Sequence, residues 1–391
     1  MTETRLNLAR QAAQRSDISS FMVMDVMAAA AEREANGLPV VHLEVGQPGT
    51  SAPIAAREAA KRAIDSDSLG YTLPLGTPAL RERIAAHYAE TYGITLAPER
   101  IVVTSGSSAG FVLTFLMLFD LADRVALPSP GYPCYRNILN ALGQEYVTLE
   151  TSPETRWMPT VEQFKAAEPA RGILLASPNN PTGTMIEPER LAALAAYCDA
   201  QDKWLISDEI YHGLTYDAPA ETALKYSPNA IIINSFSKYF SMTGWRIGWM
   251  VVPEQLVETV ERLAQNLYIC APAISQAAAL GAFDARPELE ANIDVYRANR
   301  ALLLSELPNI GISKIVPADG AFYLYADVAE FTNDSLDFSR KMLAETGVAA
   351  TSGFDFDETR GSRYMRFSYA GSTEDIQDAL ARLAKWDRLK G

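Results

Sequence analysis

Cysteine and histidine are scarce in this sequence, whose 391 residues include three of each. The cysteines are Cys134, Cys198 and Cys270, and the histidines are His42, His87 and His212. Because these residues are widely separated, their spacing matches neither a disulfide framework nor a zinc-binding pattern. The sequence therefore predicts no bound metal and no metal chemistry.

Basic residues and long apolar runs are also lacking. The 34 Lys and Arg residues are outnumbered by 48 Asp and Glu residues, giving a net charge of −14, which makes nucleic acid an unfavourable partner. Polar residues interrupt every apolar stretch before about 18 residues, so no membrane span is predicted. The first residues, Met1-Thr-Glu-Thr-Arg-Leu6, contain no apolar signal core, and we expect a cytoplasmic protein.

The balance of 48% hydrophobic and 21% charged residues is typical of a soluble globular protein, and the length allows two domains. From Gly46 to about residue 290, helical patterns alternate with short apolar runs. These runs are Ile101–Thr104, Val125–Leu127, Ile173–Ala176, Trp204–Ser207, Ile231–Ile233 and Ile247–Val252. Such runs are typical of strands buried on both faces. They predict an α/β domain with a mostly parallel sheet and with ligands at the carboxyl ends of its strands.

The pattern changes after about residue 290 to that of a smaller α+β domain. Helices are expected at Val295–Leu307, Ser335–Thr346 and Thr373–Leu389, and strands at Gly320–Tyr325 and Tyr364–Tyr369. The N-terminal segment, with a helix between Ile18 and Asn36 and a strand at Val40–Val45, is expected to pack with it. The predicted domains are therefore 46–290, and 1–45 together with 291–391.

Lys238 and Arg246 follow the apolar run Ile231–Ile233. A lysine at the end of a buried strand loses solvation, which lowers its pKa and frees the amine for covalent chemistry. An arginine just beyond it can hold a phosphate through two parallel hydrogen bonds. The alternative is an ordinary basic loop in solvent.

The stretch Thr104-Ser-Gly-Ser-Ser-Ala-Gly110 lies between a strand and the expected helix Phe111–Phe119. Free N–H groups at a helix start, with small residues that allow close approach, make an anion site. The stretch is not a GxGxxG motif, so a dinucleotide is not favoured. A simple helix cap made by serines is the alternative.

Three polar residues follow two other strands. In Ser177-Pro-Asn-Asn180-Pro-Thr-Gly183, prolines and a glycine shape a loop that directs the Asn180 amide into a cleft. Asp208 ends an apolar strand and, if buried, needs a cation or hydrogen-bond donors. One helical turn would put Tyr211 on the same face as Asp208. A helix N-cap for Asp208 and a rim position for Tyr211 are the alternatives.

Tyr132 and Tyr71 lie in proline-containing and glycine-containing loops, where each offers an aromatic side chain. Arg366 alternates with Met365 and Phe367, so it faces the opposite side of its strand. At that position the guanidinium either forms a surface ion pair or captures a carboxylate.

A phosphate-binding helix start, a lysine, a strand-end carboxylate and an arginine are what pyridoxal phosphate requires. The chain closely resembles the class I/II aminotransferase family of fold-type I pyridoxal-phosphate-dependent enzymes, from Gly46 to Arg366. The matching motifs are Asn180-Pro-Thr-Gly183, Asp208-Glu-Ile-Tyr211, Ser235-Phe-Ser-Lys238 with Arg246, and Arg366-Phe-Ser368. The resemblance implies a fold like that of aspartate aminotransferase. Its large domain has a mostly parallel seven-stranded sheet covered by helices, and its smaller domain is α+β.

The resemblance also implies a role for each site residue. Lys238 would bind the cofactor covalently and then move the substrate's α-proton, while Asp208 would pair with the pyridine nitrogen. The other cofactor contacts would be Tyr211 and Asn180 at the ring 3-oxygen, Tyr132 on the ring face, and Arg246, Ser235 and the N–H groups of Ser107, Ser108 and Ala109 at the phosphate. Arg366, with Asn180 and the Gly46 backbone, would hold the substrate α-carboxylate. Tyr71 would reach the phosphate in a neighbouring subunit, which implies a homodimer with shared sites.

Two stretches differ from the family pattern. Ala350-Thr-Ser-Gly353-Phe-Asp-Phe356-Asp357 stands where many relatives have a Pro-Gly and then a Phe-Gly. No arginine occurs in Ala271–Ser275, where dicarboxylate-specific relatives supply a second clamp. The residues that could line a pocket for a neutral or aromatic side chain, or could simply pack in the core, are Phe21, Met22, Tyr323 and Tyr325.

We therefore expect a pyridoxal-phosphate-dependent aminotransferase that acts on an amino acid and a 2-oxo acid by a ping-pong mechanism through Lys238. A β-eliminating C–S lyase would use the same residues. A non-catalytic cofactor-binding sensor is the alternative from another class, but the roughly 45 residues before Gly46 carry no basic excess that would indicate a DNA-binding module.

Overall fold

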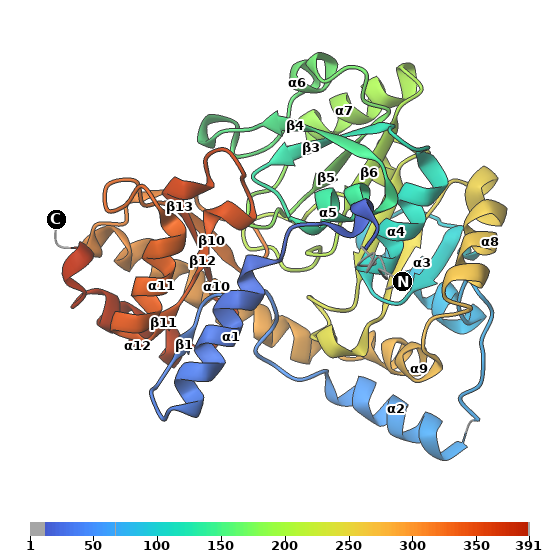
Figure 1. Cartoon of the computed structure of the whole chain (residues 1–391). Coiled ribbons are helices and arrows are strands. Elements are labelled where there is room, and N and C mark those ends of the chain that lie inside the picture. Colours follow the sequence, from blue (N-terminus) through green and yellow to red (C-terminus); the bar gives the residue numbers. More distant parts are fainter. Residues whose placement is uncertain (1–11, 67, 390–391) are drawn as a thin grey trace, which may run out of the picture.

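Seven strands form the main sheet of this computed structural model, which describes residues 12–66 and 68–389 (Figure 1). Their order across the sheet is β2-β8-β7-β6-β5-β3-β4, and β8 runs antiparallel to both of its neighbours while the other pairs are parallel. The strands are β2 (Ile101–Thr104), β3 (Arg124–Ser129), β4 (Glu145–Glu150), β5 (Gly172–Ala176), β6 (Trp204–Asp208), β7 (Ile231–Ser235) and β8 (Gly248–Val251). The predicted mostly parallel α/β sheet is confirmed.

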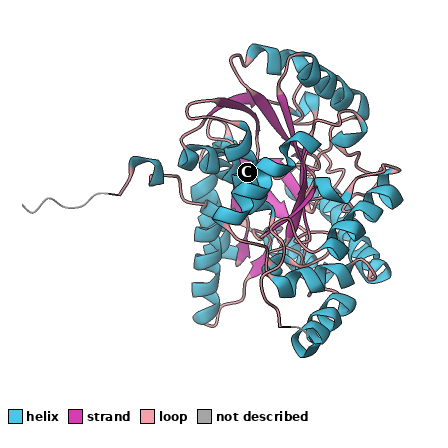
Figure 2. Cartoon of the chain, turned by 90° about the vertical axis from the view of Figure 1, so that its right-hand side faces the viewer, coloured by secondary structure: helices cyan, strands magenta, loops and turns pink. Residues whose placement is uncertain are grey.

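Successive residues of the central strands are buried on opposite faces of this sheet. Ile232 belongs to one apolar cluster, whereas Ile231 and Ile233 belong to another. Helices cover both faces, as Figure 2 shows for the strands drawn in magenta. The helices are α2 (Ile54–Ser66), α3 (Pro78–Tyr92), α4 (Ser107–Leu118), α5 (Cys134–Leu142), α6 (Val161–Ala166), α7 (Pro188–Ala200), α8 (Val257–Leu267) and α9 (Ala273–Ala282). Burial on two faces explains why these strands are continuous apolar runs in the sequence.

A second group of elements lies beside the main sheet, at the left of Figure 1. It contains an antiparallel sheet in the order β12-β13-β10-β9 and a parallel pair, β1 with β11. The strands are β1 (Val41–His42), β9 (Lys314–Ile315), β10 (Tyr323–Asp327), β11 (Val348–Ala349), β12 (Thr351–Ser352) and β13 (Tyr364–Ser368), and the helices are α1 (Met22–Ala35), α10 (Arg286–Glu306), α11 (Ser335–Thr346) and α12 (Thr373–Leu383). Val41 pairs with Val348, so the N-terminal segment joins the C-terminal part of the chain.

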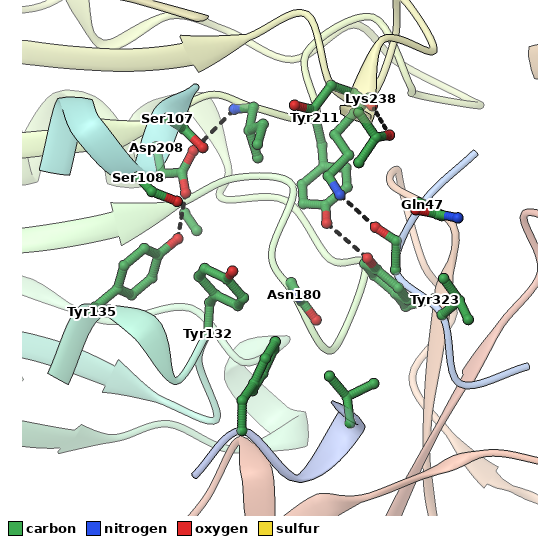
Figure 3. Close-up of a pocket in the computed structure, with 18 of the residues that line it drawn as sticks. Gln47, Ser107, Ser108, Tyr132, Tyr135, Asn180, Asp208, Tyr211, Lys238 and Tyr323 are labelled. Carbon is green, nitrogen blue, oxygen red and sulfur yellow. Dashed lines mark hydrogen bonds between the residues drawn. The ribbon is translucent and has the colours of Figure 1, made fainter. Parts of the chain in front are cut away.

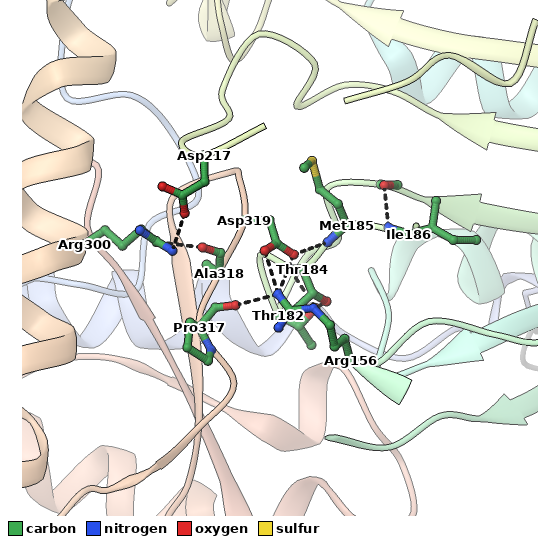
Figure 4. Close-up of polar contacts among 11 residues, drawn as sticks. Arg156, Thr182, Thr184, Met185, Ile186, Asp217, Arg300, Pro317, Ala318 and Asp319 are labelled. Atoms are coloured by element: carbon green, nitrogen blue, oxygen red, sulfur yellow. Dashed lines mark hydrogen bonds and ion pairs between the residues drawn. The ribbon is translucent and has the colours of Figure 1, made fainter. Parts of the chain in front are cut away.

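Asp319 connects the two groups of elements (Figure 4). Its carboxylate accepts hydrogen bonds from Arg156 Nη2 at 2.6 Å and from the Met185 backbone N–H at 2.8 Å. The carbonyl of Gly183 accepts hydrogen bonds from the N–H groups of Asp319 and Gly320, both at 2.9 Å. The loop that carries Asn180 is therefore held against the segment that leads into β10.

Several elements differ in their bounds from the sequence prediction. The helix expected over Thr373–Leu389 ends at Leu383, and the strand expected over Gly320–Tyr325 begins at Tyr323. The strand expected over Val40–Val45 is only two residues long, although the Leu43 N–H still donates to the Ala349 carbonyl at 2.9 Å and the Leu43 carbonyl accepts from the Ser368 N–H at 2.7 Å. The helix expected over Val295–Leu307 begins earlier, at Arg286, where a proline occupies its first turn. Among the described residues, no helix is long and apolar enough to span a bilayer, and no group of three or more possible ligand side chains could hold a metal ion.

Candidate active site

A cavity of about 350 Å³ lies at the carboxyl ends of the main-sheet strands and is closed on one side by α1. Its polar lining residues are Gln47, Ser107, Ser108, Tyr132, Tyr135, Asn180, Asp208, Tyr211, Ser237, Lys238, Thr243, Arg246, Tyr323 and Arg366. In Figure 3, Asp208 and Tyr135 lie on one side of the cavity, Lys238 and Tyr323 lie on the other, and Asn180 and Tyr132 lie between them. The parallel strands bring these residues together because their carboxyl ends share one edge of the sheet.

Lys238 lies in the turn that follows β7, and its Nζ donates a hydrogen bond to the carbonyl oxygen of Gly46. Desolvation lowers the pKa of the Lys238 amine to about 8, and the charges of Arg366 and Arg246 act in the same direction. The nitrogen lies 5.7 Å from the centre of the Tyr211 ring. A substantial fraction of this amine is therefore neutral near pH 8, as a nucleophile or a general base requires.

Asp208 is the last residue of β6, and its carboxylate is buried in the cavity wall. Oδ2 accepts a hydrogen bond from the Tyr135 hydroxyl, and Oδ1 accepts one from the Ile210 N–H at 3.1 Å. Burial raises the pKa of Asp208 to about 6, although both donors act in the opposite direction. A turn follows Asp208 where the sequence suggested a helical turn, so Asp208 caps no helix. The carboxylate has room for a cationic partner from the cavity side.

The start of α4 and the side chain of Arg246 together form an anion cradle. The N-cap of α4 is Gly106, with φ of 79°, and no side chain caps the helix. A Cβ atom at Gly106 would lie 2.5 Å from Arg246 Nη2, so a glycine permits the two segments to approach this closely. The first N–H groups of α4, which belong to Ser107, Ser108 and Ala109, thus remain available beside a guanidinium.

Ser235 does not line the cavity. Its hydroxyl donates to the Ile247 carbonyl at 3.1 Å and is hydrogen-bonded to the Ser237 hydroxyl at 2.9 Å. Ser237, two residues closer to Lys238, lines the cavity instead. Which of the two serines lines the cavity depends on the directions of their side chains at the end of β7 and in the turn after it. The spacing of the sequence motif does not show these directions.

Arg366 is 2% exposed, which excludes the surface ion pair that the sequence allowed. Its Nη1 donates to Asn180 Oδ1 at 2.9 Å, and its Nη2 donates to the Glu44 carbonyl at 2.5 Å. The buried Nε has no hydrogen-bond partner within the described part of the chain. The guanidinium is therefore a buried cation with hydrogen-bonding capacity left for an anionic ligand.

Four tyrosines complete the account of the residues that the sequence analysis proposed for the site. Tyr132 lines the cavity and contacts Phe21 edge to face, with ring centroids 5.9 Å apart. The hydroxyls of Tyr211 and Tyr323 are hydrogen-bonded at 2.8 Å. Tyr71 is 84% exposed and is not among the residues that line this chain's cavity.

Sequence reasoning missed several contributors to the site, among them Tyr135 and the first turns of α1. Tyr135 is the hydrogen-bond donor to Asp208, and its position three residues after Tyr132 on the start of a helix was the available signal. The first turns of α1 also contribute Val23, Met24 and Met27 to the cavity wall. Nothing in the local sequence of α1 connects it to the ends of strands more than a hundred residues away.

Known proteins resemble this chain over nearly its whole length. A family model described as aminotransferase class I and II matches residues 39–383. A protein of Mycobacterium tuberculosis named valine–pyruvate aminotransferase is 51% identical over 377 residues, covering 95% of this chain and 97% of that protein. A crystal structure of an aminotransferase from Mycobacterium tuberculosis has a TM-score of 0.95 at 50% identity, covering 96% of this chain and 99% of that one.

Aspartate aminotransferase from Thermus thermophilus, determined with maleate, has a TM-score of 0.91 at 32% identity and covers 96% of this chain and 99% of its own. The similarity therefore includes the fold, with its seven-stranded sheet, as well as the sequence motifs. On this evidence the chain belongs to the class I and II aminotransferases, a family of pyridoxal-phosphate-dependent transaminases.

Proposed function

We propose that this aminotransferase exchanges an amino group between an amino acid and a 2-oxo acid at the cavity that contains Lys238, Asp208 and Arg366. The observation that carries the proposal is that a lysine, a buried carboxylate and two arginines line one cavity of about 350 Å³. A ping-pong reaction requires a single site of this kind, because donor and acceptor bind to it in turn.

The cavity residues fit pyridoxal phosphate. The uncapped start of α4 and the guanidinium of Arg246 would hold the phosphate, with Ser237 nearby in place of Ser235. Asp208 would accept a hydrogen bond from the ring nitrogen, and Tyr132 would cover the ring face. Tyr211 and Asn180 would donate to the ring oxygen, since Asn180 Oδ1 already accepts from Arg366 and leaves the amide N–H groups available. When bound, the cofactor supplies a carbonyl carbon for the amino group and a ring that accepts electrons from the α-carbon.

Lys238 is the residue that would bind the cofactor and move the proton at the substrate α-carbon. Its pKa of about 8 leaves part of the amine neutral near neutral pH, so the nitrogen can act as a base without a separate activating residue. The Gly46 carbonyl, which accepts its hydrogen bond, orients the amine toward the cavity.

Arg366 would bind the substrate α-carboxylate. The guanidinium is held by the Glu44 carbonyl and by Asn180, so its orientation is set before the substrate arrives. Pre-organisation of this kind reduces the entropy that is lost when the substrate is oriented for reaction.

We also propose a homodimer in which Tyr71 completes the partner's phosphate site. Exposed apolar residues around Tyr71 support an interface there. Leu73 is 57% exposed, Ile269 is 48% exposed, and the Thr72 N–H donates to Cys270 Sγ at 3.4 Å, which joins their two segments. Sedimentation velocity should give the mass of a dimer, and a monomer would contradict this part of the proposal.

The predicted division into residues 46–290, and 1–45 with 291–391, is retained as a proposal for the two domains. Pairing of β1 with β11 supports it, because residues near 41 join residues near 348. Residues 1–11 of the smaller domain lie outside the described residues.

A single-turnover experiment tests the function. The enzyme loaded with pyridoxal phosphate is mixed separately with valine, alanine, aspartate and the sulfur amino acid cysteine. Valine is chosen because the relative from Mycobacterium tuberculosis is named for it. Transamination should remove the visible absorbance of the bound cofactor and release one 2-oxo acid per site, and pyruvate should then restore the absorbance. Release of pyruvate and ammonia from a sulfur amino acid, without lasting loss of absorbance, would indicate the eliminase instead. No change with any donor would contradict both enzymes.

A further inference from the structure

The first turn of α1 is held by a residue more than three hundred positions away. The N-cap of α1 is Phe21, which has no side-chain acceptor. Asp355 supplies it instead, because its Oδ1 accepts from the Met22 N–H at 3.0 Å and its Oδ2 accepts from the Val23 N–H at 2.9 Å. Both oxygens of one carboxylate thus satisfy two of the free N–H groups at a helix start.

Asp355 lies within the stretch Ala350–Asp357, which differs from the family pattern. Its side chain is 2% exposed, and its backbone carbonyl accepts from Arg136 Nη2 at 2.9 Å. The neighbouring residue Asp357 binds Arg360, whose guanidinium donates to the carbonyls at the end of β3 and just after β4. The stretch is therefore anchored to the main sheet, so Asp355 fixes α1 relative to the cavity and not only relative to its own loop.

The side of the cavity formed by α1 is apolar. Phe21, Val23, Met24 and Met27 line it, and in Figure 3 the short blue helical ribbon at the bottom of the view lies across the cavity from Lys238. The cavity contains three cations, which the proposed function assigns to the cofactor, its phosphate and the substrate α-carboxylate. No further cation of this chain lines the cavity within the described residues, so a second substrate carboxylate would face an apolar wall unpaired.

We propose that Asp355 is a positioning residue that holds the first turn of α1 as the wall for the substrate side chain, and that this wall selects amino acids with apolar side chains. The inference rests on the proposed function and names its donor class. Asp355 does not line the cavity, so its hydrogen bonds affect the substrate wall through α1. If the capping bonds are lost, the first turn frays and the apolar side chains lose their fixed positions.

The test compares Asp355→Ala with Asp334→Ala, both loaded with the cofactor. Asp334 is a matched control because it also caps a helix through two backbone N–H groups, those of Leu336 and Asp337 at 3.0 and 3.1 Å, but at α11, outside the cavity. Deuterium exchange is measured at the backbone amides of α1 and α11. Single-turnover rates and apparent dissociation constants are measured for leucine, alanine and aspartate.

In Asp355→Ala, exchange in α1 should become several-fold faster while exchange in α11 stays unchanged, and Asp334→Ala should show the reverse. The apparent dissociation constant for leucine should rise at least about tenfold in Asp355→Ala, while that for alanine, which scarcely reaches the wall, should change less than about threefold. The leucine-to-alanine preference should be unaltered in Asp334→Ala. Asp355→Asn, which retains one acceptor oxygen, should give an intermediate result.

Faster α1 exchange with an unchanged leucine-to-alanine preference would overturn the inference, as would unchanged exchange in α1. A wild-type preference for aspartate over leucine would overturn the donor class. Deuterium exchange does not depend on turnover. The leucine-to-alanine preference is a ratio of two measurements on the same variant, so a general loss of activity cancels in it. An enzyme that transaminates no amino acid would therefore refute the proposed function while the α1 exchange result stood on its own.

Discussion

The Tyr135 hydroxyl donates a hydrogen bond to the buried Asp208 carboxylate, and this pair forms one side of the active-site cavity. Burial raises the pKa of Asp208 to about 6, and the Tyr135 hydrogen bond reduces that rise because it stabilises the charged form. The tyrosine therefore helps to keep ionised the carboxylate proposed to pair with the cofactor ring.

Tyr135→Phe should raise the pKa of Asp208. Removal of one hydrogen bond to an ionised carboxylate costs about 2 kcal/mol, which corresponds to an upward shift of about 1.5 pKa units. Because only the ionised carboxylate attracts a protonated ring nitrogen, cofactor affinity should fall as the pH decreases through the Asp208 pKa, and the midpoint of this fall should move to higher pH in the variant. Fluorescence titration of the cofactor-free protein with pyridoxal phosphate across this range measures the midpoint.

Tyr146→Phe is the matched control for Tyr135→Phe. Its hydroxyl also donates to a carboxylate, Glu358 at 2.9 Å, but neither residue lines the cavity. Equal midpoints in the wild type and Tyr135→Phe would show that another group controls the pH dependence.

Lys238→Ala should bind pyridoxal phosphate but keep no cofactor attached after borohydride reduction, because the amine that forms the covalent bond is gone. Turnover should fall by a factor on the order of 10³, the contribution expected for a positioned acid–base group. Mass spectrometry of the reduced protein measures the attachment. Lys203→Ala, whose amine instead binds Glu168 and the Ala170 carbonyl, should behave as the wild type. A reduced adduct in Lys238→Ala would disprove the assignment of this lysine.

Gly106→Ala should weaken cofactor binding by about tenfold or more, since the new Cβ would crowd the Arg246 guanidinium and widen the phosphate cradle. The measurement is the dissociation constant for pyridoxal phosphate, compared with that for pyridoxal, which lacks the phosphate and should be affected much less.

Gly93→Ala separates crowding from backbone strain. Gly93 has φ of 69°, close to the 79° of Gly106, but its Cβ would meet nothing within 4 Å. Gly93→Ala should lose about 1 kcal/mol of folding stability from its left-handed conformation (ψ of 21°), and Gly106→Ala, with ψ of 168°, should lose about 2 kcal/mol. Only Gly106→Ala should lose cofactor affinity. Similar affinities in the two variants would argue against a phosphate site at α4.

Arg366→Lys should reduce the single-turnover efficiency with valine by about 100-fold, because a lysine keeps the charge but cannot reproduce the planar two-point contact with a carboxylate. Isobutylamine, which has the same side chain and no carboxylate, provides the comparison. Its slower reaction should change only a few-fold between wild type and variant. An equal loss for both compounds would indicate general damage to the site.

Many of the residues that line the candidate site could be predicted from short stretches of the sequence. Strands buried on both faces are continuous apolar runs, and the residues at their carboxyl ends must share one edge of a parallel sheet. Asp208, Asn180 and Lys238 were found in this way, since each follows such a run. The edge strand β4 was missed because polar residues interrupt its sequence and only one of its residues is buried. Residues 314–315 and 348–352 were missed because their strands are only two residues long.

The remaining contacts depend on how distant segments pack. Tyr135 reaches Asp208 across 73 positions of sequence, and Asp355 reaches α1 across more than 300. The strand pattern around Arg366 is equally consistent with a surface ion pair and with a buried carboxylate-binding site. Its hydrogen bonds to Asn180 and to the Glu44 carbonyl place it in the buried site. A local sequence pattern predicts helices, strands and turns, because these depend on residues that are close in the sequence. The partners of a side chain in the core arise from the docking of whole elements, and for this chain only the tertiary structure contains that information.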